Sequence, residues 1–226
     1  MNILIVAILL ILPFFTFGQG VTDHVLVDEF GKLSCDEFLA RTDNLFIQQR
    51  NQPSTEAFYV IGGSDDHILD KLAMEQLFRI AVEQRRYDLN KVKIVRSNVP
   101  GPLKIQMWLA PAGTNPTEFQ KGPSSLVLPT GKYFLIKTDN DGICNPAPIR
   151  PIARELFDAN PGGFLYAVIY GESVKRRRAE LNIAMKELDG FPKNRTRYIL
   201  RPANGRYGSD YWFVIGRQGR KEIVKW

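Results

Sequence analysis

Residues 58–63 read FYVIGG and residues 166–171 read YAVIYG, so the chain carries an apolar strand that ends in glycine twice. Both stretches follow an Asn-Pro or Asn-x-Pro corner and precede a charged segment with helical spacing. Further landmarks keep the same order in both halves, namely Cys35 and Cys144 before the strands and Trp108 and Trp212 after them. The chain is therefore predicted to be a duplicated unit.

Each copy is predicted to contain a strand, a helix, a strand, a helix and two final strands, from its alternating or helically spaced apolar residues. The first strand, first helix, second strand and second helix are predicted at 24–30, 36–50, 58–63 and 65–86 in the first copy. In the second copy they are predicted at 132–138, 146–159, 166–171 and 173–190. The final strands are predicted to form an antiparallel pair across a loop rich in Gly, Pro and Asn. The expected fold is α+β, with two tandem β-α-β-α-β-β repeats whose helices pack on mixed sheets around the quoted central strands.

The segment boundaries follow from composition. We expect a signal peptide at 1–18, a first repeat at 21–113, a linker rich in Pro, Gly, Ser and Thr at 114–130, and a second repeat at 131–226. The N-terminal apolar run is typical of a cleaved secretion signal, with an uncleaved membrane anchor as the alternative. Because the run is shorter than the roughly 20 residues of a spanning helix, a periplasmic or secreted product without a stable membrane span is expected.

The positive charge is unevenly distributed along the chain. Residues 1–137 hold 14 Lys and Arg against 14 Asp and Glu, whereas residues 138–226 hold 16 against 10, so the whole net charge of +6 lies in the second part. This indicates an anionic partner for the second copy, or charge that serves solubility. Export argues against a nucleic acid as that partner.

Cys35 and Cys144 are the only cysteines, and they stand at corresponding places before the first helix of each copy. An even cysteine count in an exported protein favours a disulfide between them. The alternative is two separate buried thiols, because duplication copies a cysteine whether or not it pairs.

Two polar clusters are candidate sites. Asp65, Asp66 and His67 stand at the turn after the first quoted strand, where helix capping by Ser64 or Asp65 is favoured over metal binding, because adjacent ligands seldom close a coordination shell. The run Lys175-Arg176-Arg177-Arg178 opens a helix, where the helix dipole disfavours cations unless an anion is bound. A solvated face is the alternative for this run.

Catalytic and cofactor-binding motifs are missing from the sequence. It contains no Gly-x-Ser-x-Gly nucleophile motif, no P-loop and no dinucleotide fingerprint, and His24 and His67 are its only histidines. No cofactor is predicted, and an enzyme of unknown type ranks third among the possible functions.

The element order, with a glycine turn after the second strand, resembles the OmpA-like periplasmic domain, many of whose members bind peptidoglycan. That family has Gly-x-Thr-Asp at the turn and an Arg-Ala pair on the next helix, and its Asp and Arg grip the carboxylate and ammonium of a wall peptide. The first copy matches the turn with Gly62-Gly63-Ser64-Asp65 and offers Arg79, whereas the second matches the pair with Arg177-Arg178-Ala179. A longer run, 42–63, is similar to uncharacterised exported bacterial proteins.

Two functions are expected from these features. The first is a non-catalytic exported cell-envelope module that binds peptidoglycan or another anionic or zwitterionic envelope polymer. The ligand-binding residues would be Asp65, Arg79, Arg176, Arg177 and Arg178. The alternative is a structural or protein-interaction module without a small ligand, in which the charges keep the protein soluble.

Overall fold

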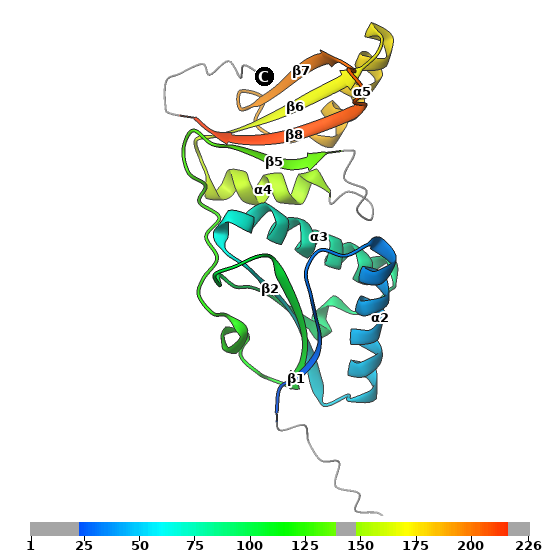
Figure 1. Cartoon of the computed structure of the whole chain (residues 1–226), viewed down its shortest axis with the longest axis vertical. Helices are drawn as coiled ribbons and strands as arrows, with labels where there is room; N and C mark the ends of the chain where they lie inside the picture. Colours follow the sequence, from blue (N-terminus) through cyan, green and yellow to red (C-terminus); the bar gives the residue numbers. More distant parts are fainter. Residues whose placement is uncertain (1–22, 139–147, 217–226) are drawn as a thin grey trace, which may run out of the picture.

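The computed structural model describes residues 23–138 and 148–216 of the chain. Two units follow one another along the long axis of the molecule, and each contains two α-helices and one four-stranded mixed sheet (Figure 1). The predicted α+β fold with two tandem repeats is confirmed. Within the described ranges, no helix is long and apolar enough to cross a membrane.

The elements agree in order between the units. The first unit contains β1 (Val25–Phe30), α2 (Cys35–Asn51), β2 (Thr55–Gly62), α3 (Ile68–Gln84), β3 (Val92–Arg96) and β4 (Lys104–Pro111). The second contains β5 (Tyr133–Thr138), α4 (Ile149–Ala159), β6 (Gly163–Gly171), α5 (Val174–Glu187), β7 (Thr196–Pro202) and β8 (Gly208–Ile215). Three short 3-10 helices lie in the first unit and after it, η1 (Asp65–His67), η2 (Leu89–Lys91) and η3 (Pro116–Phe119).

The strand order is β1-β4-β2-β3 in the first sheet and β5-β8-β6-β7 in the second, so the quoted strands are central, as predicted. The prediction that the final two strands of each copy pair with each other is wrong. The last strand lies antiparallel between the first and second strands, and the third strand pairs in parallel on the other side of the second. Strand β2 is buried along nearly its whole length and therefore has a hydrogen-bonded partner on each edge.

The two sheets share one register, which shows how closely the units correspond. Phe58 lies opposite Trp108 in the first sheet, and Tyr166 lies opposite Trp212 in the second. The opening strand of each unit also carries an irregularity at the same step of the ladder, at Leu26/Asp28 in β1 and at Leu135/Lys137 in β5. Bulges of this kind are retained within families, so their repetition supports duplication.

The first sheet is covered on both faces. Helices α2 and α3 lie on one face, where the ring of Phe78 stacks on that of Tyr59 with centroids 3.9 Å apart. On the other face, Phe119 of η3 packs against Phe58 and Trp108, with ring centroids 4.5 and 5.6 Å apart. The segment that the sequence predicts as a linker therefore contributes to the core of the first unit.

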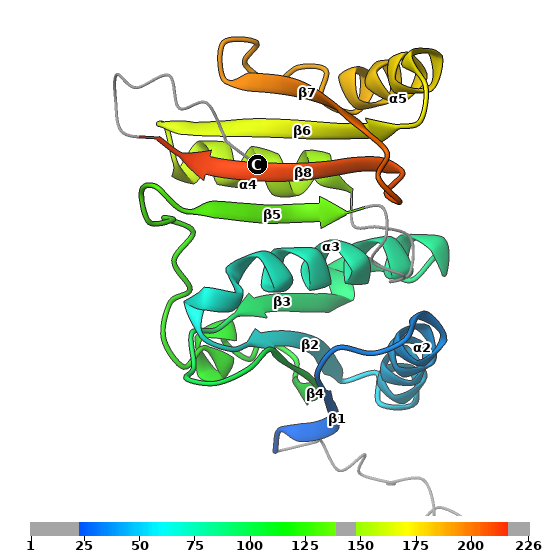
Figure 2. The same cartoon turned by 45° about the horizontal axis from the view of Figure 1, so that its top comes forward.

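The units pack directly against each other through α3, which lies between the first sheet and the second unit (Figures 1 and 2). Ile68 and Leu72 of α3 belong to the core of the second unit, not to that of the first. Their neighbours in that core include Leu128, Ile136, Ile149, Ile152, Ala153 and Leu156. One apolar core therefore spans the junction between the repeats.

Substitution of Leu72 tests this junction. Because Leu72 is fully buried between the units, Leu72→Ala should lower the free energy of unfolding by about 2–5 kcal/mol, measured by denaturant titration. Ile183→Ala on the exposed side of α5 is the matched control and should change it by less than about 0.5 kcal/mol. Equal losses in the two variants would contradict a shared core.

Candidate functional site

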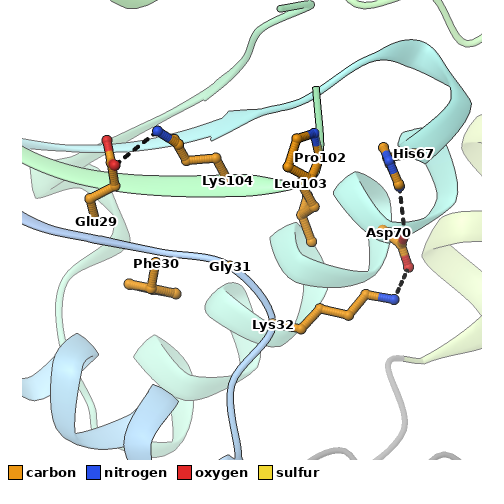
Figure 3. A pocket seen from close by; sticks show the side chains of 9 residues that line it. All are labelled: Glu29, Phe30, Gly31, Lys32, His67, Asp70, Pro102, Leu103 and Lys104. Atoms are coloured by element: carbon orange, nitrogen blue, oxygen red, sulfur yellow. Dashed lines mark hydrogen bonds and ion pairs between the residues drawn. The ribbon is translucent and has the colours of Figure 1, made fainter. Parts of the chain in front are cut away.

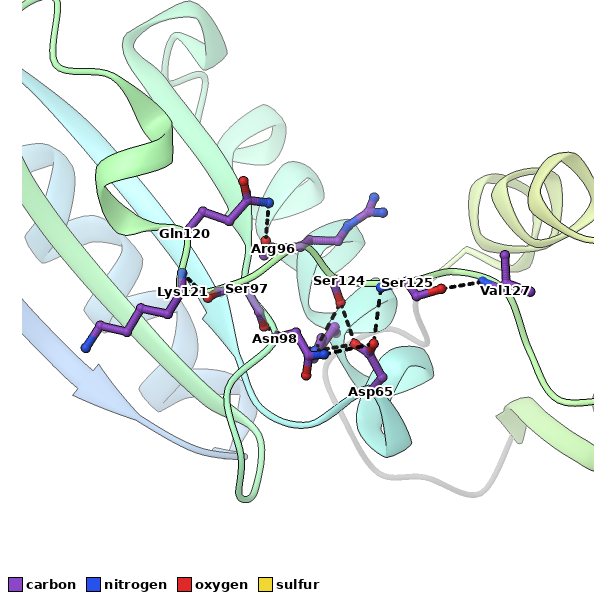
Figure 4. Close-up of polar contacts among 10 residues, drawn as sticks. Asp65, Arg96, Ser97, Asn98, Gln120, Lys121, Ser124, Ser125 and Val127 are labelled. Carbon is purple, nitrogen blue, oxygen red and sulfur yellow. Dashed lines mark hydrogen bonds and ion pairs between the residues drawn. The ribbon is translucent and has the colours of Figure 1, made fainter.

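Asp65, a predicted ligand-binding residue, is engaged by neighbours within the protein (Figure 4). Its Oδ1 accepts hydrogen bonds from Lys71 Nζ (3.2 Å) and Ser124 Oγ (3.0 Å), and its Oδ2 accepts from Asn98 Nδ2 (3.1 Å) and Ser125 N (3.3 Å). Partial burial raises the pKa of Asp65, but hydrogen bonds from Ser124, Ser125 and Lys71 outweigh this and hold it below its usual range. Both oxygens thus fasten the segment after η3 to the start of α3.

The Lys71 ammonium also links these segments, from inside the protein. It is fully buried and also donates to the Ser97 carbonyl oxygen (3.2 Å) and to Ser124 Oγ (3.1 Å). The predicted capping by Ser64 and Asp65 is wrong. Ser64 is the N-cap residue of η1, but its side chain accepts no capping hydrogen bond. The Asp65 carboxylate instead accepts hydrogen bonds from Ser124 and Ser125, which are distant in sequence. The Asp65 carboxylate is therefore stabilised by Ser124, Ser125 and Lys71 and not by the N–H groups of the helix that it precedes.

Arg79 belongs to a separate ionic network at the junction of the units. Its guanidinium donates to Glu75 Oε1 at 2.8 and 3.0 Å, and Arg96 donates to Glu75 Oε2 at 2.6 Å. Arg96 also reaches Glu155 of the second unit at 2.6 Å. Burial raises the pKa of Glu75, but the two guanidinium groups outweigh it, Arg96 first, and hold it below its ordinary value. The structure therefore assigns Asp65 and Arg79 to different networks.

The three predicted arginines of α5 are placed differently from one another. Arg177 donates to the Gly171 carbonyl oxygen at 2.7 Å and so holds the end of β6. Arg176 lies over the ring of Tyr207, 5.5 Å from its centroid, and Arg178 is exposed. Their part in ligand binding stays a prediction. In the described part of the chain, no group of three or more His, Cys, Asp or Glu residues is arranged to hold a metal ion.

A cavity of about 580 Å³ opens at one edge of the first sheet, next to the start of α3 (Figure 3). Its apolar walls come from Phe30, Leu103 and Pro102. Lys32, in the loop after β1, lies on one side and pairs with Asp70 of α3 at 2.8 Å. The cavity thus combines an apolar wall with an ion pair between the loop after β1 and α3.

The remaining polar residues of the cavity are also paired. The His67 ring nitrogen Nδ1 lies 3.3 Å from Asp70 Oδ2. At the rim, Lys104 Nζ donates to Glu29 Oε1 at 2.9 Å. This hydrogen bond is the main cause that lowers the pKa of Glu29, and a hydrogen bond from Gln106 is the second. No Ser, Thr or Cys is among the residues that line the cavity, so its His–Asp pair has no hydroxyl or thiol nucleophile beside it there.

Topology explains why a cavity forms here. Strands β1, β2 and β3 run in the same direction, so their carboxyl ends lie on the same side of the sheet as the cavity. In sheets that contain parallel strands, ligands commonly bind at these carboxyl ends. Gly63 lets the loop before β4 come close: its φ is +127°, and an added Cβ would lie 3.1 Å from both Pro102 O and Leu103 Cα. A side chain at position 63 would therefore push away the wall of the cavity.

Sequence reasoning identified this turn but not the charged residues that line the cavity. Lys32 follows Gly31 directly after a predicted strand, and Asp70 lies in the second turn of the helix predicted at 65–86, which is the first turn of the observed α3. A search for opposite charges next to the carboxyl ends of parallel strands could have found both. Their contact depends on the relative position of β1 and α3, which local spacing does not reveal.

The Glu75 network leads to a prediction for acid stability. Because the pKa of Glu75 is lowered in the folded state, its contribution is present above its unfolded value and is lost as the pH falls through the lower folded value. We expect Glu75→Gln to be less stable than the parent by about 1–3 kcal/mol at pH 7, and the difference to shrink below about pH 4.3. Chemical denaturation across this pH range measures both effects.

Glu83→Gln, an exposed substitution on the same helix, is the control and should leave the pH profile unchanged. A constant difference between Glu75→Gln and the parent from pH 7 to pH 3 would show that the Glu75 carboxylate contributes no linkage.

The disulfide predicted between Cys35 and Cys144 stays a prediction. Cys35 is the first residue of α2, whereas Cys144 lies outside the described residues. A bond between them would close a loop of about 110 residues and stabilise the fold by about 4–5 kcal/mol in the chain-entropy model. Thiol labelling of the unfolded, unreduced protein should give no label, rising to two per chain after reduction. Two labels before reduction would rule the bond out.

Comparison with models of known protein families, with curated proteins and with solved structures found no match to this chain. Its relation to the OmpA-like domain therefore stays a prediction.

Proposed function

We propose that the protein is a non-catalytic module of the bacterial cell envelope that binds a zwitterionic group of a wall component in the cavity between β1, α3 and the loop before β4. The observation that carries this proposal is the ion pair of Lys32 and Asp70 in the lining of a cavity of about 580 Å³. The resemblance to the OmpA-like domain supports the same ligand class.

The chemistry of the pair fits a ligand that carries an ammonium and a carboxylate. Lys32 would donate to the ligand carboxylate, and Asp70 would accept from the ligand ammonium. Both side chains remain partly exposed, at 60% and 35%, so a ligand can replace their mutual contact without leaving a charge buried and unpaired. The apolar wall formed by Phe30 and Leu103 would hold the methylene groups between the two charges.

The residues predicted from the sequence take other parts in this proposal. Asp65 stiffens the start of α3 by holding Ser124 and Lys71, and thereby positions Asp70 five residues later. Arg79 and Arg177 hold structural partners. Arg176 and Arg178 remain available for longer-range attraction to an anionic polymer.

Binding to purified peptidoglycan tests the proposal. The full chain should be retained at low salt, and Lys32→Met or Asp70→Asn should weaken retention about tenfold or more, because each removes one charge-assisted hydrogen bond. A synthetic peptide whose terminal side chain carries both an ammonium and a carboxylate should compete. Arg85→Met is the matched control, because it breaks a comparable ion pair with Asp43 away from the cavity.

No retention of the parent at low salt would exclude the proposal. Retention that survives both cavity substitutions would place the binding elsewhere. The absence of retention would leave the structural or protein-interaction module as the better account, and the apolar junction between the two units is the observation that favours it.

A further inference from the structure

Far fewer residues are buried in helix α5 than in its counterpart α3. Ten residues of α3 are buried, on the sheet side and on the side facing the second unit. In α5 only Ala184 is buried. Helix α5 and strand β7 form one end of the molecule in both views, at the opposite end from β1 (Figures 1 and 2).

Exposed apolar side chains gather where α5 meets β7. The Glu187 carboxylate of α5 accepts a hydrogen bond from Tyr211 of β8, so that side of the helix faces β8. With 3.6 residues per turn, Val174 and Met185 lie on the side turned towards β7, and they are 59% and 50% exposed.

Strand β7 continues this apolar strip. Tyr198 and Leu200 pair with Ala167 and Ile169 of β6, whose side chains lie in the helix-side core, so they point to the same face of the sheet as α5. They are 36% and 45% exposed. Apolar side chains of the helix and of the edge strand thus form adjoining parts of one surface.

The same region carries the charge of the protein. Residues 174–202 hold nine Lys and Arg against three Asp and Glu, so this stretch alone accounts for a net +6, equal to that of the whole chain. Lys175 and Arg178 are exposed beside the apolar strip. Here the α5–β7 surface means Val174, Lys175, Arg178, Met185, Tyr198 and Leu200.

We propose that the α5–β7 surface docks on an anionic lipid surface. Cations would contact the headgroup phosphates while the interspersed apolar side chains enter the interface, which is how amphipathic surface helices bind membranes. A soluble polyanion would use only the cations and leave Met185 and Leu200 in water. This surface is distinct from the cavity, so the proposal does not depend on the function proposed above.

Co-sedimentation of the full chain with vesicles tests the proposal. Vesicles of phosphatidylglycerol in phosphatidylcholine should retain the protein, and added salt should weaken binding, whereas phosphatidylcholine alone should not retain it. Lys175→Glu with Arg178→Glu should weaken binding at least about tenfold. Met185→Ser with Leu200→Ser should also weaken it about tenfold, with the charges intact.

The control is Lys91→Glu with Lys121→Glu, which makes the same change in net charge at exposed positions in the first unit and in the segment after η3. Circular dichroism should show that all variants are folded. No binding of the parent to anionic vesicles at low salt would overturn the proposal, and so would equal losses in the control and the α5 variant. Binding to poly-glutamate as tight as to vesicles, unaffected by the Met185 and Leu200 substitutions, would instead identify a site for acidic polymers.

Discussion

Helix α3 buries two opposite sides at once, and most of the structure depends on this constraint. One side packs through Phe78 on the first sheet, and the other packs through Ile68 and Leu72 in the core of the second unit. Because the helix is held from both sides, its first turn is fixed relative to the sheet edge. That fixed turn presents Asp70 to the cavity and Lys71 to the carboxylate of Asp65. The proposed ligand site is therefore positioned by the contact between the repeats.

The sequence predicted the features that depend on local periodicity and missed those that depend on distant contacts. The duplicated strands, their central place and the helices follow from apolar spacing, which each segment carries in itself. The insertion of β4 between β1 and β2 does not follow, because the loop at 97–103 is compatible with either edge of β2. The distant partners of Asp65 were also missed, since Ser124 and Ser125 meet it only when the segment after η3 folds back. The charge pair of the cavity joins β1 to α3 for a similar reason.

Charged residues serve two separate purposes in the two units. In the first, the buried Lys71 pairs with Asp65, and Arg96 pairs with Glu75 and with Glu155 across the junction. In the second, Lys175 and Arg178 face outward from the helix that corresponds to α3. Repulsion between these cations disfavours stacking of a further unit there, as polar caps do in repeat proteins, in spite of the exposed apolar side chains beside them. The first unit therefore packs on its neighbour through α3, whereas the second unit exposes the corresponding side of α5.

The two sheets join equivalent ladder positions by connections of unequal length. Phe58 pairs with Lys93 and Tyr166 with Arg197, so the connection spans 35 residues in the first unit and 31 in the second. Helix α3 has 17 residues and α5 has 14, and the 3-10 helix η1 before α3 has no counterpart at the described residues 172–173 before α5. The ladder therefore fixes the two ends of this connection, while the length of the helix and of the turn before it can differ between the copies.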